Sequence, residues 1–308
     1  MNTTLTKMIT HLDDIIKEVK VRGKKRLVAA YANDSHTIGA TSMAIDAGII
    51  DATLVGDIET IKKVCKEEGI DVAKYRLVQE ADEQKAANKA VELINNGEGD
   101  ILMKGLCTTD KYMRAILNKE KGLMPGGKSV LSHVTVFEVP TYHKLLVTSD
   151  VAVIPAPDFN QKVAITNYVI NTAKTLGIEK PKVAMIAATE QMTFGMQACV
   201  EAALIAAMGN RGQIKGGIID GPLAMDVAID KESAEIKKLT GEVAGDADCL
   251  VWPNIESGNV FYKTATKLAK AELAAMVVGA KVPCVLSSRG DSTKTKMYSI
   301  ALAALSAK

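Results

Sequence analysis

A short segment near the end of this sequence combines hydroxyl, guanidinium and carboxylate side chains. Residues 287–291 read Ser-Ser-Arg-Gly-Asp; they follow an apolar run, 282–286, expected as a buried strand, and precede a helix expected over 292–306. A strand-to-helix turn presents free backbone N–H groups and the positive end of the helix dipole to an oxyanion. Arg289 adds a planar fork suited to bidentate phosphate binding. The segment is therefore predicted to bind phosphate or an acyl phosphate.

A second turn also carries cations and hydroxyls. Lys104 ends an apolar strand pattern, and Thr108 or Thr109 can cap the helix that follows. Lys104 and Arg114 flank this turn, so both can face an anion at the helix start; a capped turn with solvated charges is the alternative. Cys107 lies in the same turn, but no neighbouring histidine or carboxylate is placed to activate it as a nucleophile.

Two asparagines with a glycine, one histidine and one aspartate form the remaining candidates. Asn254 and Asn259 offer donors and acceptors in a polar strand-to-helix turn, and Gly258 allows close approach to a ligand. His133 lies within a strand pattern, where a structural histidine is the alternative to a catalytic one. Asp220 is a carboxylate at a strand end, where substrate contacts tend to lie.

These groups are positioned by alternating strand and helix patterns, which predict an α/β fold with mostly parallel sheets. The strands are expected at residues 26–32, 52–55, 75–79, 101–105, 130–137, 144–148, 182–188, 216–219, 249–252 and 282–286. The helices are expected at residues 3–20, 36–47, 58–68, 82–96, 109–119, 160–176, 194–208, 231–242, 258–270 and 292–306.

The chain is long enough for two domains, because a single core rarely grows to 308 residues. The glycine-rich stretch 120–129 marks the first crossing between domains, and a second is expected near 272–281. Residues 1–128 and 273–308 should then form a discontinuous first domain, and residues 129–272 a second one. The active site is expected in the cleft between them.

Composition limits the partners. A net charge of +2 without long charged runs argues against nucleic acid, and no segment is apolar enough to span a bilayer. The amphipathic N-terminal pattern indicates a core helix rather than a signal peptide. Five scattered cysteines without a CxxC pair favour neither disulfides nor zinc, so we expect a cytoplasmic protein with no metal.

Four segments together resemble the phosphate acetyl/butyryltransferase family. They are Asp-Ile-Leu-Met-Lys-Gly at 100–105, Ser-His-Val-Thr-Val-Phe-Glu-Val-Pro at 132–140, Pro-Asn-Ile-Glu-Ser-Gly-Asn-Val-Phe-Tyr-Lys at 253–263 and the Ser-Ser-Arg-Gly-Asp segment at 287–291. They occur in the family's order, and the likeness runs from about residue 25 onward. Met-Lys-Gly at 103–105 resembles the butyryl branch, because the acetyl branch usually has Ser-Gly there.

This resemblance implies reversible transfer of a butyryl group between coenzyme A (CoA) and inorganic phosphate, by direct attack without a covalent acyl-enzyme. It also implies two α/β domains with the architecture of isocitrate and isopropylmalate dehydrogenases, and a homo-oligomer. CoA is a substrate, and no tightly bound cofactor is expected. The resemblance assigns phosphate binding to Arg114, and Ser288 and Arg289 match the family's Ser-Arg pair. We expect Lys104, Thr108 and Thr109 to assist with phosphate.

Four residues are expected to bind CoA or the rest of the substrate: Asn254, Gly258, Asn259 and Asp220. The thiol base differs from the family pattern. Acetyl-branch members have an aspartate seven residues after the serine of the Ser-Arg pair, and this sequence has Thr295 there. Asp291 and His133 are the alternative bases.

Three other functions are considered beside butyryl transfer. A phosphate acetyltransferase would have the same machinery with a smaller acyl group. A decarboxylating dehydrogenase would need an acidic metal cluster and nicotinamide contacts, neither of which the sequence has. A non-catalytic sensor of CoA or acyl phosphate is favoured only by Thr295.

Overall fold

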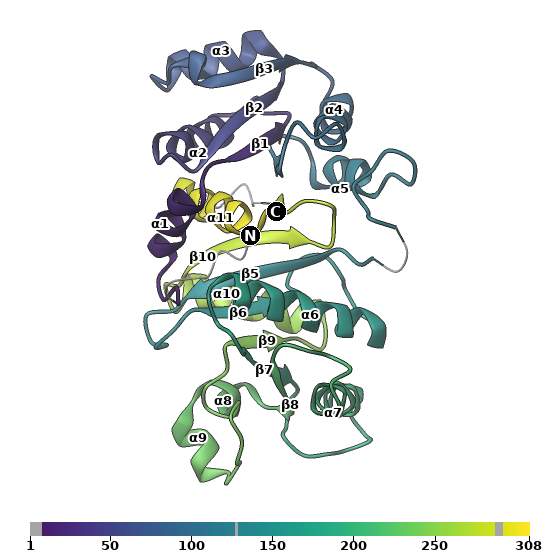
Figure 1. Ribbon diagram of the computed structural model, residues 1–308. Helices are drawn as coiled ribbons and strands as arrows, with labels where there is room; N and C mark the ends of the chain where they lie inside the picture. The colour runs from purple at the N-terminus through teal and green to yellow at the C-terminus, as the bar shows by residue number, and fades with distance from the viewer. Residues whose placement is uncertain (1–7, 127–128, 287–291) are drawn as a thin grey trace. The chain divides into compact units, whose positions relative to one another are not determined.

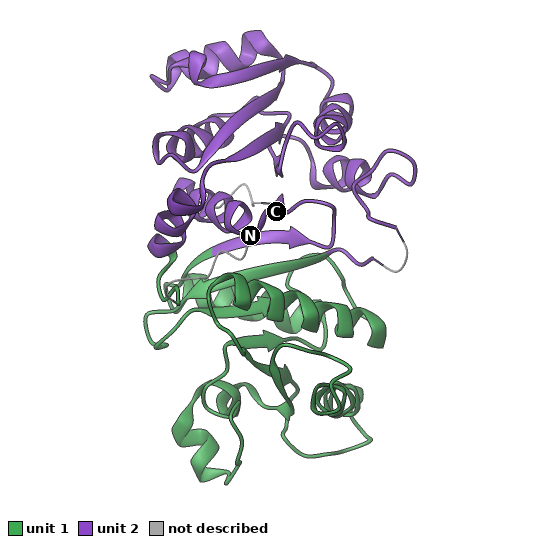
Figure 2. Cartoon of the chain, in the orientation of Figure 1, with its two compact units in different colours: residues 1–12, 132–273 green, residues 13–131, 274–308 purple. Residues whose placement is uncertain are grey.

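The structure is a computed structural model that describes residues 8–126, 129–286 and 292–308. Helices and strands alternate along these residues, which confirms the α/β class expected from the sequence. The chain forms two compact units, which Figure 2 shows in different colours. Unit 1 comprises Met1–Leu12 and Ser132–Leu273, and unit 2 comprises Asp13–Leu131 and Ala274–Lys308.

The described residues 8–12 group with unit 1, whereas the sequence placed them in the domain formed by 1–128 and 273–308. Side-chain contacts explain the difference. The Glu138 carboxylate accepts hydrogen bonds from the Leu12 N–H and from His11 Nδ1, both at 2.8 Å. These contacts fasten the segment to the strand that carries Glu138.

Unit 2 contains a sheet with the strand order β3-β2-β1-β4-β11-β10, in which only β10 is antiparallel to its neighbour β11. Helices α2 and α11 lie on one side of it and α4 and α5 on the other (Figure 1). The strands are β1 (Lys25–Ala30), β2 (Ile50–Gly56), β3 (Tyr75–Gln79), β4 (Ile101–Lys104), β10 (Glu272–Val278, in this unit from Ala274) and β11 (Cys284–Val285). The helices are α1 (Leu12–Arg22), α2 (Ser35–Asp46), α3 (Ile58–Glu67), η1 (Val72–Lys74), α4 (Glu83–Asn95), α5 (Thr109–Leu117) and α11 (Thr293–Ser306).

Aspartates cap the N-termini of three of these helices, each within four residues of the end of the preceding strand. Asp34, Asp57 and Asp82 each accept a hydrogen bond from a backbone N–H in the first turn of α2, α3 and α4. Such caps satisfy donors that have no partner within the helix. Beneath the same edge, the buried Tyr112 hydroxyl donates to the carbonyls of Leu102 in β4 and Val285 in β11. It therefore fixes the two strands that precede the predicted phosphate segments.

Unit 1 contains a sheet with the order β5-β6-β9-β7-β8, parallel except for β5. The strands are β5 (Ser132–Glu138), β6 (Leu146–Ser149), β7 (Lys182–Ile186), β8 (Ile218–Leu223) and β9 (Cys249–Val251). The helices are α6 (Phe159–Thr175), α7 (Gln197–Asn210), α8 (Met225–Ile229), α9 (Lys231–Ile236) and α10 (Ile255–Lys267). Because β5 runs opposite to β6, the start of β5 lies at the edge where the parallel strands end.

An ion network joins the starts of the parallel strands at the opposite edge of this sheet. Asp246 Oδ1 lies 2.8 Å from Lys144 Nζ and 2.9 Å from His143 Nε2, and its Oδ2 lies 2.6 Å from Lys182 Nζ. Lys144 also contacts Asp248 at 2.7 Å. Partial burial favours protonation of Asp246, but the hydrogen bonds from Lys144 and Lys182 outweigh it and hold its pKa well below the usual range.

Three expectations about the elements were wrong. No strand was expected over residues 272–278, yet they form β10, because their apolar side chains are buried in a sheet although the alanine-rich sequence also suits a helix. Helix α1 begins at Leu12, so the described residues 8–11 lie outside it although a helix was expected over 3–20. The segment 225–242 contains two short helices, α8 and α9, where a single helix was expected over 231–242.

Candidate functional site

The turn after β4 is held tightly against the end of β1. A Cβ atom on Gly105 would lie 2.4 Å from the Tyr31 carbonyl oxygen, so only glycine fits this approach. Lys104 is buried, and its ammonium donates to the carbonyls of Gly105 at 3.0 Å and Cys107 at 2.8 Å. Lys104 thus contributes positive charge inside the turn as well as fixing its shape.

The N-terminus of α5 already has a carboxylate beside it. Thr108 is the N-cap residue, and its own backbone N–H donates to Glu83 Oε1. Lys111 Nζ contacts the other oxygen of Glu83. The hydrogen bond from Lys111 is the main reason that the pKa of Glu83 lies below its ordinary value. The expected phosphate position is therefore next to an internal anion, which the sequence reasoning missed.

The other expected phosphate ligands on α5 are accessible to solvent. Thr109 is exposed, and the Arg114 side chain has 72% of its surface exposed. Arg114 Nε lies 3.0 Å from Asp110 Oδ2, one helical turn earlier. An exposed pair of this kind contributes little to stability, so the guanidinium can exchange Asp110 for a stronger anion.

Strand β11 lies beside β4 in parallel, with Val285 opposite Met103. Both strands therefore end at the same edge of the unit 2 sheet, and the chain continues from that edge into residues 287–291. The predicted residues Ser288, Arg289 and Asp291 lie outside the described part of the structure.

Thr295, at the family position for the aspartate, belongs to the helix cap of α11. Its N–H donates to Ser292 Oγ at 3.1 Å, and the two hydroxyl oxygens lie 3.0 Å apart. A hydroxyl engaged in a cap offers no carboxylate or imidazole to accept a thiol proton. The structure gives this position a local structural role.

Cys107 is buried, and burial raises its pKa to about 11. A thiol of that acidity is almost wholly protonated at neutral pH, and the thiolate is the nucleophilic form. The geometry therefore disfavours a covalent acyl-cysteine at this turn.

In unit 1, His133 lies beside a buried carboxylate that sequence reasoning did not select. Asp150 directly follows β6 and has 3% of its surface exposed. Its Oδ1 accepts hydrogen bonds from the N–H groups of Ala152 (2.8 Å) and Val153 (2.9 Å). Its Oδ2 accepts from Ile154 N–H (3.2 Å), Ser132 Oγ (3.0 Å) and His133 N–H (3.3 Å). The His133 ring is itself buried, with Nδ1 3.3 Å from Thr135 Oγ1.

The α10 segment packs directly on the loop that Asp150 organises. Asn254 is the N-cap and accepts from the Ser257 N–H at 3.0 Å. A Cβ on Gly258 would lie 2.4 Å from the Asp150 carbonyl oxygen, so this glycine permits helix–loop packing. The sequence reasoning expected a ligand to make that close approach. Asn259 Nδ2 donates to the Val151 carbonyl at 3.1 Å.

A shallow hollow opens beside the start of α10. It combines an aromatic and apolar wall with polar groups of the first helical turn. Its lining is Met225, Trp252, Asn254, Glu256, Ser257, Val260, Phe261 and Thr264. The Trp252 and Phe261 rings lie 4.9 Å apart, and Trp252 Nε1 donates to Thr148 Oγ1. This wall suits a ligand with both an apolar chain and hydrogen-bonding groups.

Asp220 takes a different position from the other candidates in unit 1. It pairs with Ala184 within the sheet, and its Oδ1 accepts from the N–H of Gly221 at 2.8 Å. His133, Gly258 and Asn259 are thus brought together around Asp150 and its loop, whereas Asp220 is engaged in its own strand.

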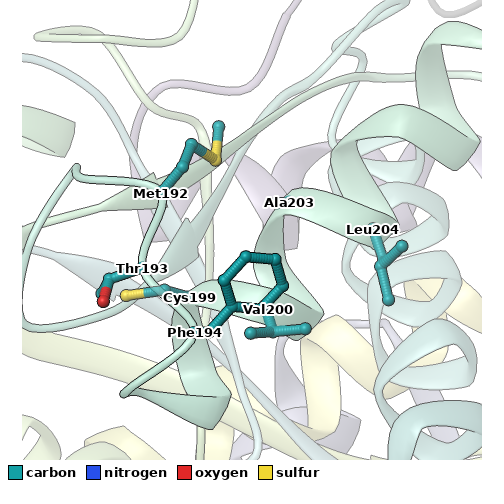
Figure 3. A pocket seen from close by; sticks show the side chains of 7 residues that line it. All are labelled: Met192, Thr193, Phe194, Cys199, Val200, Ala203 and Leu204. Atoms are coloured by element: carbon teal, nitrogen blue, oxygen red, sulfur yellow. The ribbon is translucent and has the colours of Figure 1, made fainter.

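An apolar pocket lies at the N-terminal part of α7 (Figure 3). Phe194 is 96% exposed, Met192 73% and Leu204 52%. Figure 3 shows the Phe194 ring close to Val200, while Leu204 projects from the following turn of the helix. Helix α7 is apolar around nearly its whole circumference, a pattern more typical of buried helices than of exposed ones.

The described residues contain neither a cluster of metal ligands nor a membrane-spanning helix. Within 8–126, 129–286 and 292–308, no three His, Cys, Asp or Glu side chains gather in a way that could hold a metal ion. No helix in these ranges is both long and apolar enough to cross a membrane.

The sequence is similar to one family over most of its length. The profile described as phosphate acetyl/butaryl transferase matches residues 78–304. A phosphate butyryltransferase of Clostridium acetobutylicum is 45% identical over 97% of this chain and 98% of its own. A phosphate acetyltransferase of Thermotoga maritima is 38% identical over 96% of this chain and 99% of its own.

Solved structures have the same fold. A branched-chain phosphotransacylase from Enterococcus faecalis V583 superposes with a TM-score of 0.81 at 29% identity, covering 92% of this chain and 98% of that one. A 4-hydroxythreonine-4-phosphate dehydrogenase from Klebsiella pneumoniae has a TM-score of 0.55 at 12% identity, covering 91% and 98%. The latter likeness concerns the fold alone and agrees with the dehydrogenase-like architecture expected from the sequence.

Proposed function

The chain belongs to the phosphate acetyl/butyryl transferase family, and on that premise we propose that it is a phosphate butyryltransferase. The proposed reaction is butyryl-CoA + phosphate ⇌ butyryl phosphate + CoA. The observation that carries the proposal is the likeness to a butyryltransferase over nearly the whole of both chains. The Thermotoga maritima relative named for acetyl transfer is 38% identical, against 45% for the Clostridium acetobutylicum butyryltransferase, which makes the acetyl reaction the second candidate.

The phosphate end of the substrate is proposed to bind at the edge where β4 and β11 end. Arg114 supplies a solvent-accessible guanidinium, and Lys104 adds a buried positive charge behind the turn. Thr108 and Thr109 contribute the start of α5. Ser288 and Arg289, assigned by the family resemblance, follow β11 from this same edge.

CoA is proposed to bind at the start of α10, through Asn254, Gly258 and Asn259, with Asp220 as a further candidate. The hollow beside this helix start supports the assignment because its aromatic wall can cover a pantetheine chain while Asn254 and Ser257 contact amides. The residues proposed to bind phosphate belong to unit 2 and those proposed to bind CoA belong to unit 1, so the proposed reaction needs residues of both units.

In the direction that forms butyryl-CoA, the CoA sulfur attacks the carbonyl carbon of butyryl phosphate. A C–S bond forms, the C–O bond to phosphate breaks, and the phosphate leaves with the electron pair. A thiol with a pKa of about 8.5 is mostly protonated at pH 7, so a base must accept its proton. Asp291 or His133 is proposed for this role. The Ser288 hydroxyl is proposed to stabilise the oxyanion, a contribution typically of ~3 kcal/mol.

A homo-oligomer is proposed with α7 at its interface. The exposed Met192, Phe194 and Leu204 side chains extend an otherwise apolar helix, and a second copy of the chain would cover them. Leu204→Glu should lower the mass measured by light scattering. Leu268→Glu is the matched control, since Leu268 is also exposed in unit 1 but follows α10.

A cytoplasmic location is proposed from the cysteines. All five are free and buried thiols, as expected for a reducing compartment.

The deciding experiment is thiol release from butyryl-CoA in the presence and absence of phosphate. The proposal expects release only with phosphate, together with formation of an acyl phosphate that hydroxylamine traps. Acetyl-CoA is run in parallel, and kcat/KM should favour butyryl-CoA by about 10-fold or more, the scale of discrimination by added methylenes. CoA binding without turnover would favour the sensor, and nicotinamide reduction with a hydroxy acid would favour the dehydrogenase.

A further inference from the structure

Asp150 has no part in the reaction proposed above, yet its burial requires an explanation. An ionised carboxylate in a protein interior is costly unless hydrogen bonds compensate it. Here both oxygens are engaged by donors, three of which are backbone N–H groups of the segment 152–154. The carboxylate therefore determines the conformation of the loop that follows β6.

That loop contacts α10 at three positions. The Ile255 N–H donates to the Pro155 carbonyl at 2.9 Å. Gly258 packs against the Asp150 carbonyl, and Asn259 donates to the Val151 carbonyl. All three contacts lie within the first turns of the helix, beside Asn254, Gly258 and Asn259 of the proposed CoA site. A shift of the loop would therefore move the helix start as a whole.

We propose that Asp150 is a positioning residue for CoA: it fixes the 150–155 loop, and the loop sets the position of the α10 start on which CoA binds. This inference rests on the proposed function, because it takes the α10 start as the CoA site. Ser132 assists by donating to Asp150 Oδ2, and its hydroxyl lies 2.9 Å from that of Ser149.

The test uses the full chain and two readouts for CoA. Trp252 is the single tryptophan and lines the hollow beside Asn254, so its fluorescence during titration with CoA gives a dissociation constant without turnover. Steady-state kinetics then give separate KM values for butyryl-CoA and for phosphate. Both readouts are measured for the wild-type protein before any variant.

Asp150→Asn keeps the shape of the side chain but places an NH₂ group against N–H donors. Loss of hydrogen bonds to a charged acceptor should weaken CoA binding by about 10-fold or more. The KM for butyryl-CoA should rise in parallel, whereas the KM for phosphate should stay within about twofold and kcat at saturating CoA should change less than KM. A purely structural role would instead lower the active fraction and thermal stability without this selectivity.

Asp230→Asn is the matched control, because Asp230 caps α9 in the same unit and asparagine caps helices equally well.

Should Asp150→Asn fail to fold, Ser132→Ala decides, since it removes one donor and keeps the carboxylate. An increase of about threefold in the CoA dissociation constant, with unchanged phosphate KM, is then expected. Wild-type CoA affinity in the folded variant overturns the positioning role. A wild-type protein that does not bind CoA overturns the proposed function instead.

Discussion

Glu83 and Lys111 form an ion pair at the N-terminus of α5, and the same carboxylate accepts the N–H of Thr108. The Glu83 carboxylate thus places a negative charge directly at the helix end that is proposed to bind phosphate, and Lys111 balances that charge. Since like charges repel, Glu83 weakens the attraction of this end for a second anion while it fixes the turn.

Glu83→Gln should therefore lower the KM for phosphate. Removing one charge at a helix terminus changes binding by about two- to fivefold. The same variant should unfold at a lower temperature, because Lys111 loses its charged partner. Glu92→Gln on the exposed part of α4 should change neither value. A phosphate KM that rises in Glu83→Gln would mean that Glu83 chiefly positions the phosphate ligands.

Arg114→Ala should raise the KM for phosphate by about 10-fold or more, the usual scale for a lost hydrogen bond to a charged group. Because Arg114 is exposed and paired only with Asp110 in the described structure, the fold should survive. Arg114→Lys should restore part of the affinity, since lysine keeps the charge without the fork. Arg289→Ala is expected to behave alike. Wild-type phosphate dependence in either alanine variant would remove that arginine from the site.

The pH profile distinguishes the two candidate bases. If Asp291 accepts the thiol proton, Asp291→Asn should reduce butyryl-CoA formation much more at pH 6.5 than at pH 9, where hydroxide already produces thiolate. Loss by the same factor at both pH values would indicate a turn or cap role. If His133→Gln alone gives the pH-dependent loss, the histidine is the base.

Asp246→Asn should destabilise the protein at pH 7. The folded pKa of Asp246 is depressed, so its contribution is present above the unfolded value of about 4 and disappears as the pH falls through the folded value. The side chain is 39% exposed, and after discounting for solvent screening we expect a loss of about 1–2 kcal/mol. Urea unfolding at pH 7 and pH 3.5 should show the gap to wild type narrowing with acid. Asp51→Asn, in an exposed pair with Lys24, should stay within about 0.5 kcal/mol at both.

The fold could be predicted from the sequence to a large extent, because apolar strand runs and Asp caps repeat in a regular order. Strand β10 was missed since alanine suits helices locally, and its pairing within a sheet is a tertiary effect. The observed start of the first helix is also set by a contact that local sequence does not show. The apolar periodicity continues upstream of Leu12, but Glu138, far along the chain, binds His11 and the Leu12 N–H.

Candidate site residues could be selected from the sequence where several reactive side chains lie in one short segment. Lys104, Thr108 and Arg114 were proposed as phosphate ligands because they share one turn and helix, and this assignment stays a prediction. Glu83 and Asp150 were missed because their partners are distant along the chain: Glu83 contacts Thr108 and Lys111, and Asp150 contacts Ser132. Only Asp150 had a sequence signal, a carboxylate just after an apolar strand, the same signal that singled out Asp220.

The discontinuous composition of unit 2 has a consequence for synthesis on the ribosome. Its strands β10 and β11 and helix α11 are translated last, more than a hundred residues after β4, beside which β11 is placed. Unit 1 has all its residues once Leu273 has emerged, so it can finish folding first. Unit 2 must wait with an unfilled strand position next to β4. A nascent chain paused before residue 274 should thus hold a protease-resistant unit 1 and a protease-sensitive unit 2. The open edge of β4 can aggregate during this interval, so we expect a chaperone to bind the incomplete unit 2.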